Sequence, residues 1–166
     1  MALRILLEVI IMTFGIHHTC LTVSDMEKSL KFYRDGLELE VVQDVEEQGE
    51  RLSRETQMEG AHNRLVWLKT TMGNTLVELL QYINPVGKPF PADARCCDVG
   101  MPHISFLVEN IDETYEKLCG MGVKFTAPPM ACDNSTFEGA KTAYCYDPDG
   151  IFVELFQIPV DTTKFY

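Results

Sequence analysis

The sequence predicts an α+β fold in which two paired βαβββ modules form a cupped mixed sheet with helices on its outer face. Two observations support this prediction. The stretch "HTCLTVSDMEKSLKFYRDGLELE", which begins at His18, aligns without a gap to "HISFLVENIDETYEKLCGMGVKF", which begins at His103. Further along, "TLVELLQY" and "IFVELFQI" share the pattern Val-Glu-Leu-x-Gln around Glu78 and Glu154. Each copy of such a repeat is one structural unit, and the two units bury a common core.

The first module is expected to span residues 15–83. Its opening run, Ile16–Val23, reads as a strand, and Ser24 with Glu27 fits a capping box at the start of a helix. Apolar residues then recur at helical spacing. Three further strands are expected at Leu39–Val45, Arg64–Thr70 and Thr75–Tyr82. The polar stretch Glu46–Asn63 has no counterpart in the second copy, so it is interpreted as an excursion of the chain, an insertion present in the first module only.

The second module is expected to span residues 101–158. Asn110 is placed to cap its helix, and Gly120 and Gly122 supply the stop signal. Its strands are expected at Pro102–Val108, Val123–Phe125, Lys141–Tyr146 and Ile151–Gln157. A linker at residues 84–100, rich in Pro and Gly, joins the modules, and residues 159–166 form a C-terminal tail.

The chain opens with "MALRILLEVIIM", which we interpret as part of an N-terminal arm over residues 1–14. Glu8 interrupts the apolar run and no small-residue cleavage site follows it, which argues against a signal peptide. The run is also too short to cross a bilayer as a helix. An alternative is that natural translation starts at Met12, directly before the first module.

Composition restricts the function. The 166 residues are 46% hydrophobic, which suits one domain with a sizeable core. The formal net charge is −11. Binding to nucleic acid or to an anionic membrane surface needs clustered Lys and Arg, so neither partner is expected. The expected partner is a small-molecule substrate.

The six cysteines contain no CxxC pair, and Cys96 directly precedes Cys97. This spacing is awkward for a disulfide framework and favours free thiols in a reducing cytoplasm. Cys20 and Cys145 fall on expected strands and should be buried as small hydrophobic residues.

Each module offers a histidine on its first strand and a glutamate on its last. A pseudo-twofold packing of the modules would bring together His18, Glu78, His103 and Glu154. Two imidazoles and two carboxylates suit a divalent cation such as Zn, Ni, Co, Mn or Fe. His17 competes with His18, but the alignment to His103 selects His18, and His17 should then face the opposite way.

The motifs that carry a family resemblance are "HHTCLTVSDMEKSLKFYRDGLELE", "VELLQY", "PHISFLVENID" and "YDPDGIFVELFQ". Through them the chain resembles the vicinal oxygen chelate superfamily over residues 15–158. That superfamily includes glyoxalase I, methylmalonyl-CoA epimerase, extradiol dioxygenases and fosfomycin or bleomycin resistance proteins. The resemblance implies the paired-module fold and a homodimer.

A carboxylate from each module resembles the glyoxalase and epimerase branch, whereas the dioxygenases use two histidines and one carboxylate. The resemblance implies a metal-dependent isomerase, epimerase or lyase that acts through an enediolate on a small carbonyl or thioester substrate. By the same resemblance Glu154 is the first candidate for the catalytic base and Glu78 the second. The alternatives are a metal-free or metal-assisted binding or resistance protein, or an extradiol-type dioxygenase.

Glu59, His62 and the basic residues are the features that bear on the choice of substrate, and they select none. Glu59 is a candidate for the second base of an epimerase, although its register is offset and a solvated loop charge is an equal interpretation. His62, in the same loop, reads as a surface residue. The available basic residues form no cluster that would indicate a glutathione site.

Overall fold

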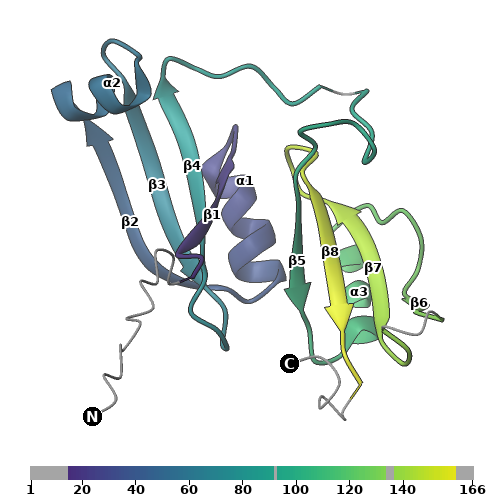
Figure 1. Ribbon diagram of the computed structural model, residues 1–166. Helices are drawn as coiled ribbons and strands as arrows, with labels where there is room; N and C mark the ends of the chain where they lie inside the picture. The colour runs from purple at the N-terminus through teal and green to yellow at the C-terminus, as the bar shows by residue number, and fades with distance from the viewer. Residues whose placement is uncertain (1–14, 92, 134–136, 160–166) are drawn as a thin grey trace, which may run out of the picture.

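Two four-stranded mixed sheets, one from each half of the chain, make up the fold (Figure 1). The computed structural model describes residues 15–91, 93–133 and 137–159, so the predicted N-terminal arm and most of the C-terminal tail lie outside the described residues. The first half comprises β1 (His18–Thr22), α1 (Met26–Leu30), η1 (Lys31–Gly36), β2 (Glu40–Gln48), α2 (Glu50–Thr56), β3 (His62–Lys69) and β4 (Leu76–Asn84). The second half comprises β5 (His103–Leu107), α3 (Ile111–Gly120), β6 (Met130–Ala131), β7 (Lys141–Tyr146) and β8 (Phe152–Gln157).

The predicted βαβββ order is confirmed in both halves, but the strands form two sheets where one cupped sheet was expected. The orders are β1-β4-β3-β2 and β5-β8-β7-β6. In each sheet the first strand runs parallel to the last and the remaining pairs are antiparallel. Strands β1 and β5 each form an edge of their own sheet. Hydrogen bonds that join the two halves run from Ser24 to Asp149 and from Tyr33 to Asp147.

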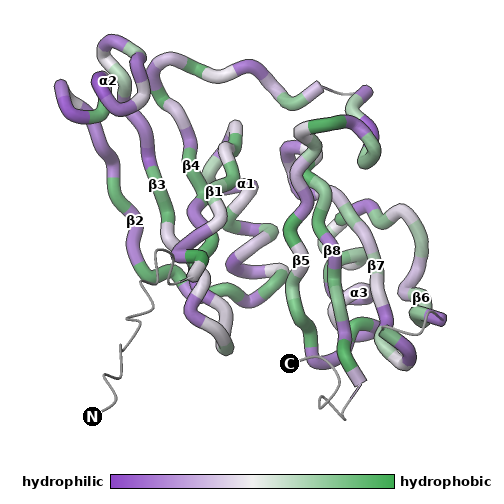
Figure 2. The backbone as a smooth tube through the Cα atoms, viewed as in Figure 1, coloured by the Kyte–Doolittle hydropathy of each residue, from purple (hydrophilic) through white to green (hydrophobic). Residues whose placement is uncertain are grey.

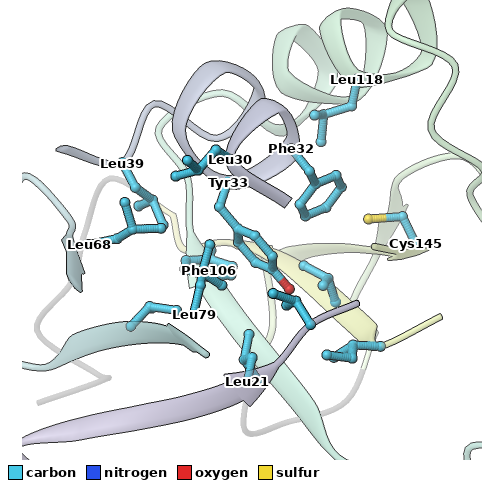
Figure 3. Packing of buried hydrophobic residues seen from close by; sticks show 14 of the residues in the cluster. Leu21, Leu30, Phe32, Tyr33, Leu39, Leu68, Leu79, Phe106, Leu118 and Cys145 are labelled. Carbon is cyan, nitrogen blue, oxygen red and sulfur yellow. The ribbon is translucent and has the colours of Figure 1, made fainter. Parts of the chain in front are cut away.

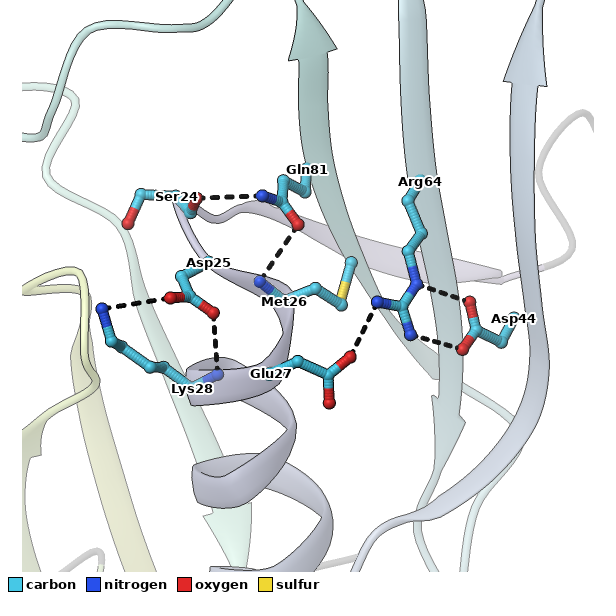
Figure 4. Close-up of polar contacts among 8 residues, drawn as sticks. All are labelled: Ser24, Asp25, Met26, Glu27, Lys28, Asp44, Arg64 and Gln81. Atoms are coloured by element: carbon cyan, nitrogen blue, oxygen red, sulfur yellow. Dashed lines mark hydrogen bonds and ion pairs between the residues drawn. The ribbon is translucent and has the colours of Figure 1, made fainter.

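The first helix begins one residue later than the capping-box pattern indicated. Asp25, not Ser24, is the N-cap, and its side chain accepts a hydrogen bond from the backbone N–H of Lys28 (Figure 4). Ser24 is instead engaged by Asp149 of the second half, which accepts from its backbone N–H at 2.9 Å and also from its hydroxyl. In the second half Asn110 caps α3 as predicted, accepting from Glu113 N–H.

Two other local predictions change. The excursion at Glu46–Asn63 is partly ordered, since β2 runs on to Gln48 and the short helix α2 follows it with Leu52 buried. The strand expected at Val123–Phe125 is reduced to a single bridge between Phe125 and Cys145. The edge strand of the second sheet is instead β6, which is two residues long.

The core is shared by both halves and centres on Tyr33. Its side chain is fully buried, and its hydroxyl donates to Asp147 Oδ2 at 2.9 Å. Figure 3 shows the Tyr33 ring among residues of both halves, including Leu79 from β4 and Phe106 from β5. Burial of each large apolar side chain contributes about 1.5–3 kcal/mol, so this junction stabilises one arrangement of the two modules.

Figure 2 shows hydrophobic residues along β5 and β8 and largely hydrophilic ones on α2. All six cysteines are free, as predicted. Cys145 is buried as expected, but Cys20 is exposed, because it lies on the face of β1 that points away from the core. Among the described residues, no helix is both long and apolar enough to cross a membrane.

Candidate metal centre

Each sheet carries one histidine–glutamate pair. His18 Nε2 on β1 lies 3.4 Å from Glu78 Oε2 on β4. His103 Nε2 on β5 lies 3.7 Å from Glu154 Oε2 on β8. The two pairs therefore occupy corresponding positions in the two modules, as the internal repeat predicted.

Strand alternation explains how these carboxylates reach the surface of otherwise apolar strands. Val77 and Leu79, which flank Glu78, point into the core and are at most 4% exposed. Val153 and Leu155 flank Glu154 in the same way and are fully buried. Both glutamates consequently project from the sheet face that lies away from the core.

This face lies opposite the helices, and from here on we call it the outer face of each sheet. Apolar and aromatic residues surround the pairs on it. In the first sheet the apolar and aromatic residues on the face of Glu78 are Leu65, Trp67, Leu76, Leu80 and Tyr82. In the second sheet those on the face of Glu154 are Leu107, Tyr144, Tyr146, Phe152 and Phe156, with Ser105 and Thr142 among them. Glu78 and Glu154 keep side-chain exposures of 13% and 11%, so each carboxylate sits low among apolar neighbours.

Polar side chains on the adjacent strands lie beside each glutamate. The Tyr144 hydroxyl donates to Glu154 Oε1 at 2.5 Å. Cys20 is the cross-strand partner of Glu78 in the β1–β4 register. Desolvation and a hydrogen bond to Glu78 raise the pKa of the Cys20 thiol to about 12, although the residue as a whole keeps exposed surface. Desolvation and the bond to Glu154 likewise raise the pKa of Tyr144 to about 12.

Aromatic contacts hold the first histidine. The ring of Trp67, on β3, meets the ring of His18 edge to face with centroids 4.8 Å apart. His17 lies against the same Trp67 at 5.6 Å, and its Nδ1 is 2.9 Å from His18 Nδ1. The prediction that His17 faces the opposite way is therefore wrong. His17 precedes the first residue of β1, so strand alternation does not govern its direction.

The four predicted ligands are brought together two by two and not as one group of four. Among the described residues, no three His, Cys, Asp or Glu side chains are grouped so that they could hold one metal ion. Each pair alone provides one nitrogen and one carboxylate. A structural zinc site has four protein ligands and a catalytic one has three, so a single pair supplies fewer ligands than either kind of site needs.

The spacing within each pair nevertheless suits shared ligation. Two ligand atoms that each lie about 2.1 Å from one ion are separated by about 3.0–3.4 Å at angles of 90–110°. The first pair falls at the upper end of this range and the second, at 3.7 Å, is slightly wider. The donor types and spacing of the two pairs therefore fit a borderline divalent cation.

Glu59 and His62 lie away from this centre. His62 is the first residue of β3 and is 2.9 Å from Glu46, whereas Trp67 is the β3 residue opposite Glu78. Five residues of strand separate His62 from Trp67, which corresponds to about 16 Å. Glu59 is exposed before β3 begins. Neither residue is placed to act with the His18–Glu78 pair.

The paired modules and their matched outer faces define a class of protein built from two similar halves. The chain belongs to the Glyoxalase/Bleomycin resistance protein/Dioxygenase superfamily, whose sequence profile matches residues 15–155. A curated relative is the uncharacterized protein YwkD of Bacillus subtilis, which is 26% identical over 143 residues. That match spans 86% of this chain and 96% of the relative.

Solved structures agree with this fold. A glyoxalase family protein from Bacillus cereus is similar with a TM-score of 0.80 at 19% identity, covering 90% of this chain and 97% of that one. The trypanothione-dependent glyoxalase I of Leishmania major is similar with a TM-score of 0.59 at 23% identity, covering 87% of each chain. These likenesses establish the fold of both modules.

Proposed function

We propose that the chain is a metal-dependent isomerase, epimerase or lyase of the glyoxalase type. The substrate class is a small carbonyl compound or thioester with a proton on the carbon next to the carbonyl group. The observation that carries the proposal is the pair of matched His–Glu contacts, at 3.4 and 3.7 Å, on equivalent strands of the two modules.

The cation would be held between two copies of the chain. His18 and Glu78 of one protomer would supply one half of the ligand set, and His103 and Glu154 of a second copy would supply the other half. Two facts support this arrangement. Each pair stands on an apolar outer sheet face, and within the described part of one chain the pairs do not combine into a group of three. A twofold dimer would build two such sites.

When bound, the cation supplies Lewis-acid stabilisation of the negative charge that develops on the substrate oxygens. The protein's own groups do the rest. Glu154, deep among Tyr144 and Phe152, takes the proton from the carbon next to the carbonyl and returns it to the product. Glu78 is the second candidate for this role. Contact of these faces with a second copy would exclude water and so strengthen each charge interaction inside the site.

Metal stoichiometry in mixed dimers tests the shared site. Two variants each lose one pair, namely His18→Ala/Glu78→Ala and His103→Ala/Glu154→Ala. Alone, each is expected to lose bound metal. Co-refolded in equal amounts, half of the dimers combine one chain of each kind, and each of these contains one intact site. The mixture should therefore recover about a quarter of the wild-type metal. A mixture that recovers none would contradict a site shared between protomers.

The reaction itself is tested by proton exchange in heavy water, with Zn, Ni, Co and Mn each supplied to the metal-free protein. We expect exchange of the proton next to the carbonyl in a 2-hydroxy carbonyl compound or an acyl thioester. A second candidate function, a binding protein without catalysis, is favoured by the absence of a three-ligand group in the described part of one chain. Metal-free protein that binds apolar ligands on its outer sheet faces and exchanges no proton would support that candidate.

A further inference from the structure

A hollow of about 500 Å³, separate from the His–Glu pairs, lies where the two modules meet. Its walls come from three places: α1 with η1, the segment that follows α3, and the turn after β7. Its lining includes none of the four candidate metal ligands. The volume falls within the range of about 300–1,000 Å³ that is typical of sites for small molecules.

The rim is basic in a strongly acidic chain. Lys28, Lys31 and Lys124 all line the hollow, although the sequence has 14 basic and 25 acidic residues. Helical spacing places the first two on one side of the first helix, three residues apart. Lys124 joins them from the second module. The three ammonium groups concentrate positive potential over one opening.

These lysines are available to a ligand. Within the part of the chain that the structure describes, neither Lys31 nor Lys124 has a carboxylate within ion-pair distance. Lys28 contacts Asp25 at 3.0 Å, but its side chain is 73% exposed, and such a surface pair contributes little.

The lining beneath the rim is apolar. It is formed by Phe32, Met121 and Val123. The hollow also contains Asp147, whose oxygens are already engaged. One accepts from the Tyr33 hydroxyl, and the other accepts from two backbone N–H groups of the turn. Asp147 therefore does not offer a free carboxylate to the opening.

We infer that this hollow binds a small amphipathic anion, a molecule with an apolar body and one carboxylate. The body lies against the apolar lining, and the carboxylate lies between Lys31 and Lys124, with Lys28 beside them. Because the hollow joins the two modules, a bound anion would also link them. This inference does not depend on the proposed metal chemistry, since no candidate ligand for the metal lines the hollow.

Amide chemical shifts of the full chain test it with 4-phenylbutyrate as the probe, and 4-phenylbutanol as its neutral counterpart. We expect saturable shifts at Met121, Gly122 and Val123 with the carboxylate and at least about fivefold weaker binding of the alcohol. Lys31→Gln/Lys124→Gln should weaken carboxylate binding about fivefold or more. The matched control Lys69→Gln/Lys88→Gln, which removes the same charge elsewhere, should bind as the wild type does.

Three results would overturn the inference. Equal affinity for the alcohol would show that charge plays no part. Unchanged affinity of the Lys31→Gln/Lys124→Gln variant would remove the proposed recognition. Broadening of these amides that rises with protein concentration, without displacement by the probe, would mean that a second copy of the chain occupies the hollow.

Discussion

The Tyr144 hydroxyl donates a hydrogen bond to Glu154 across neighbouring strands, at 2.5 Å between the two oxygens. At the equivalent place in the first module Trp67 lies opposite Glu78, and the side-chain hydrogen bond to Glu78 comes from the Cys20 thiol on β1. The two halves of the proposed centre thus match in their ligands and differ in what holds those ligands. A phenol is a firmer donor than a thiol, so Glu154 is the better oriented of the two carboxylates.

Loss of the Tyr144 hydroxyl should leave Glu154 in place but less firmly oriented. Tyr144→Phe is expected to lower metal affinity about 10- to 100-fold, the usual cost of losing a partner that orients a metal ligand. Isothermal titration with zinc measures this effect. Tyr146→Phe, two residues along the same strand, is the matched control and should leave the affinity unchanged, since Tyr146 contacts Phe152 and not Glu154. Equal losses in both variants would indicate a general effect on β7.

Neutral isosteres of the two carboxylates should separate ligation from folding. Glu154→Gln is expected to weaken metal binding and abolish turnover while circular dichroism and the melting temperature stay close to those of the wild type. Glu78→Gln should act in the same direction but less severely, because a glutamine oxygen can still approach a cation. Full metal content and full activity in both variants would exclude these glutamates from the site.

The single tryptophan should report metal binding directly. Trp67 contacts His18 edge to face at 4.8 Å, so a change in the charge on the imidazole alters the surroundings of the only indole in the chain. Addition of zinc to metal-free protein is expected to change the fluorescence intensity in a saturable way. The same titration of His18→Ala should give no such change. A wild-type signal that persists in that variant would place the cation elsewhere.

Asp147 should make stability depend on pH in a specific direction. Burial raises the pKa of this carboxyl above its ordinary value of 3.8. Its contribution to stability is therefore greatest below the unfolded pKa and declines as the pH rises through the folded pKa. Asp147→Asn keeps an oxygen for the two backbone N–H groups and cannot ionise. The melting temperature of the wild type, relative to this variant, should fall from pH 3 towards neutrality and then level off.

Much of the fold followed from the repeat. The element order, the Asn110 cap and strand β7 could all be predicted, because local spacing and an internal copy constrain them. The cap of the first helix was predicted wrongly at Ser24, because Ser24 bonds to Asp149, which lies far along the chain in the other module, and Asp25 caps the helix. The division into two sheets was also hidden, because sequence patterns state which strands exist but not whether β1 and β5 share hydrogen bonds.

The sequence predicted one group of four ligands, whereas the structure places these residues as two separate His–Glu pairs, and their role as ligands stays a prediction. Matching positions in two copies identified the His–Glu pairs, but a repeat cannot say whether the copies meet within one chain or between two. Trp67 and Tyr144 were missed altogether. Strand alternation offers a signal, because each lies directly opposite a candidate glutamate, but the register that makes this visible depends on turn geometry.

Strand β1 forms one edge of the first sheet and β5 one edge of the second, and among the described residues each is paired on one side only. Such edges present backbone N–H and C=O groups that a strand of another copy can bond. Edge contacts that are reciprocal between two copies close into a dimer, whereas contacts made in series extend into a filament. Residues 85–102 join the last strand of one sheet to the first strand of the other, so we expect a change in the length of this segment to alter which assembly can form. Such a change would act on assembly without altering either sheet.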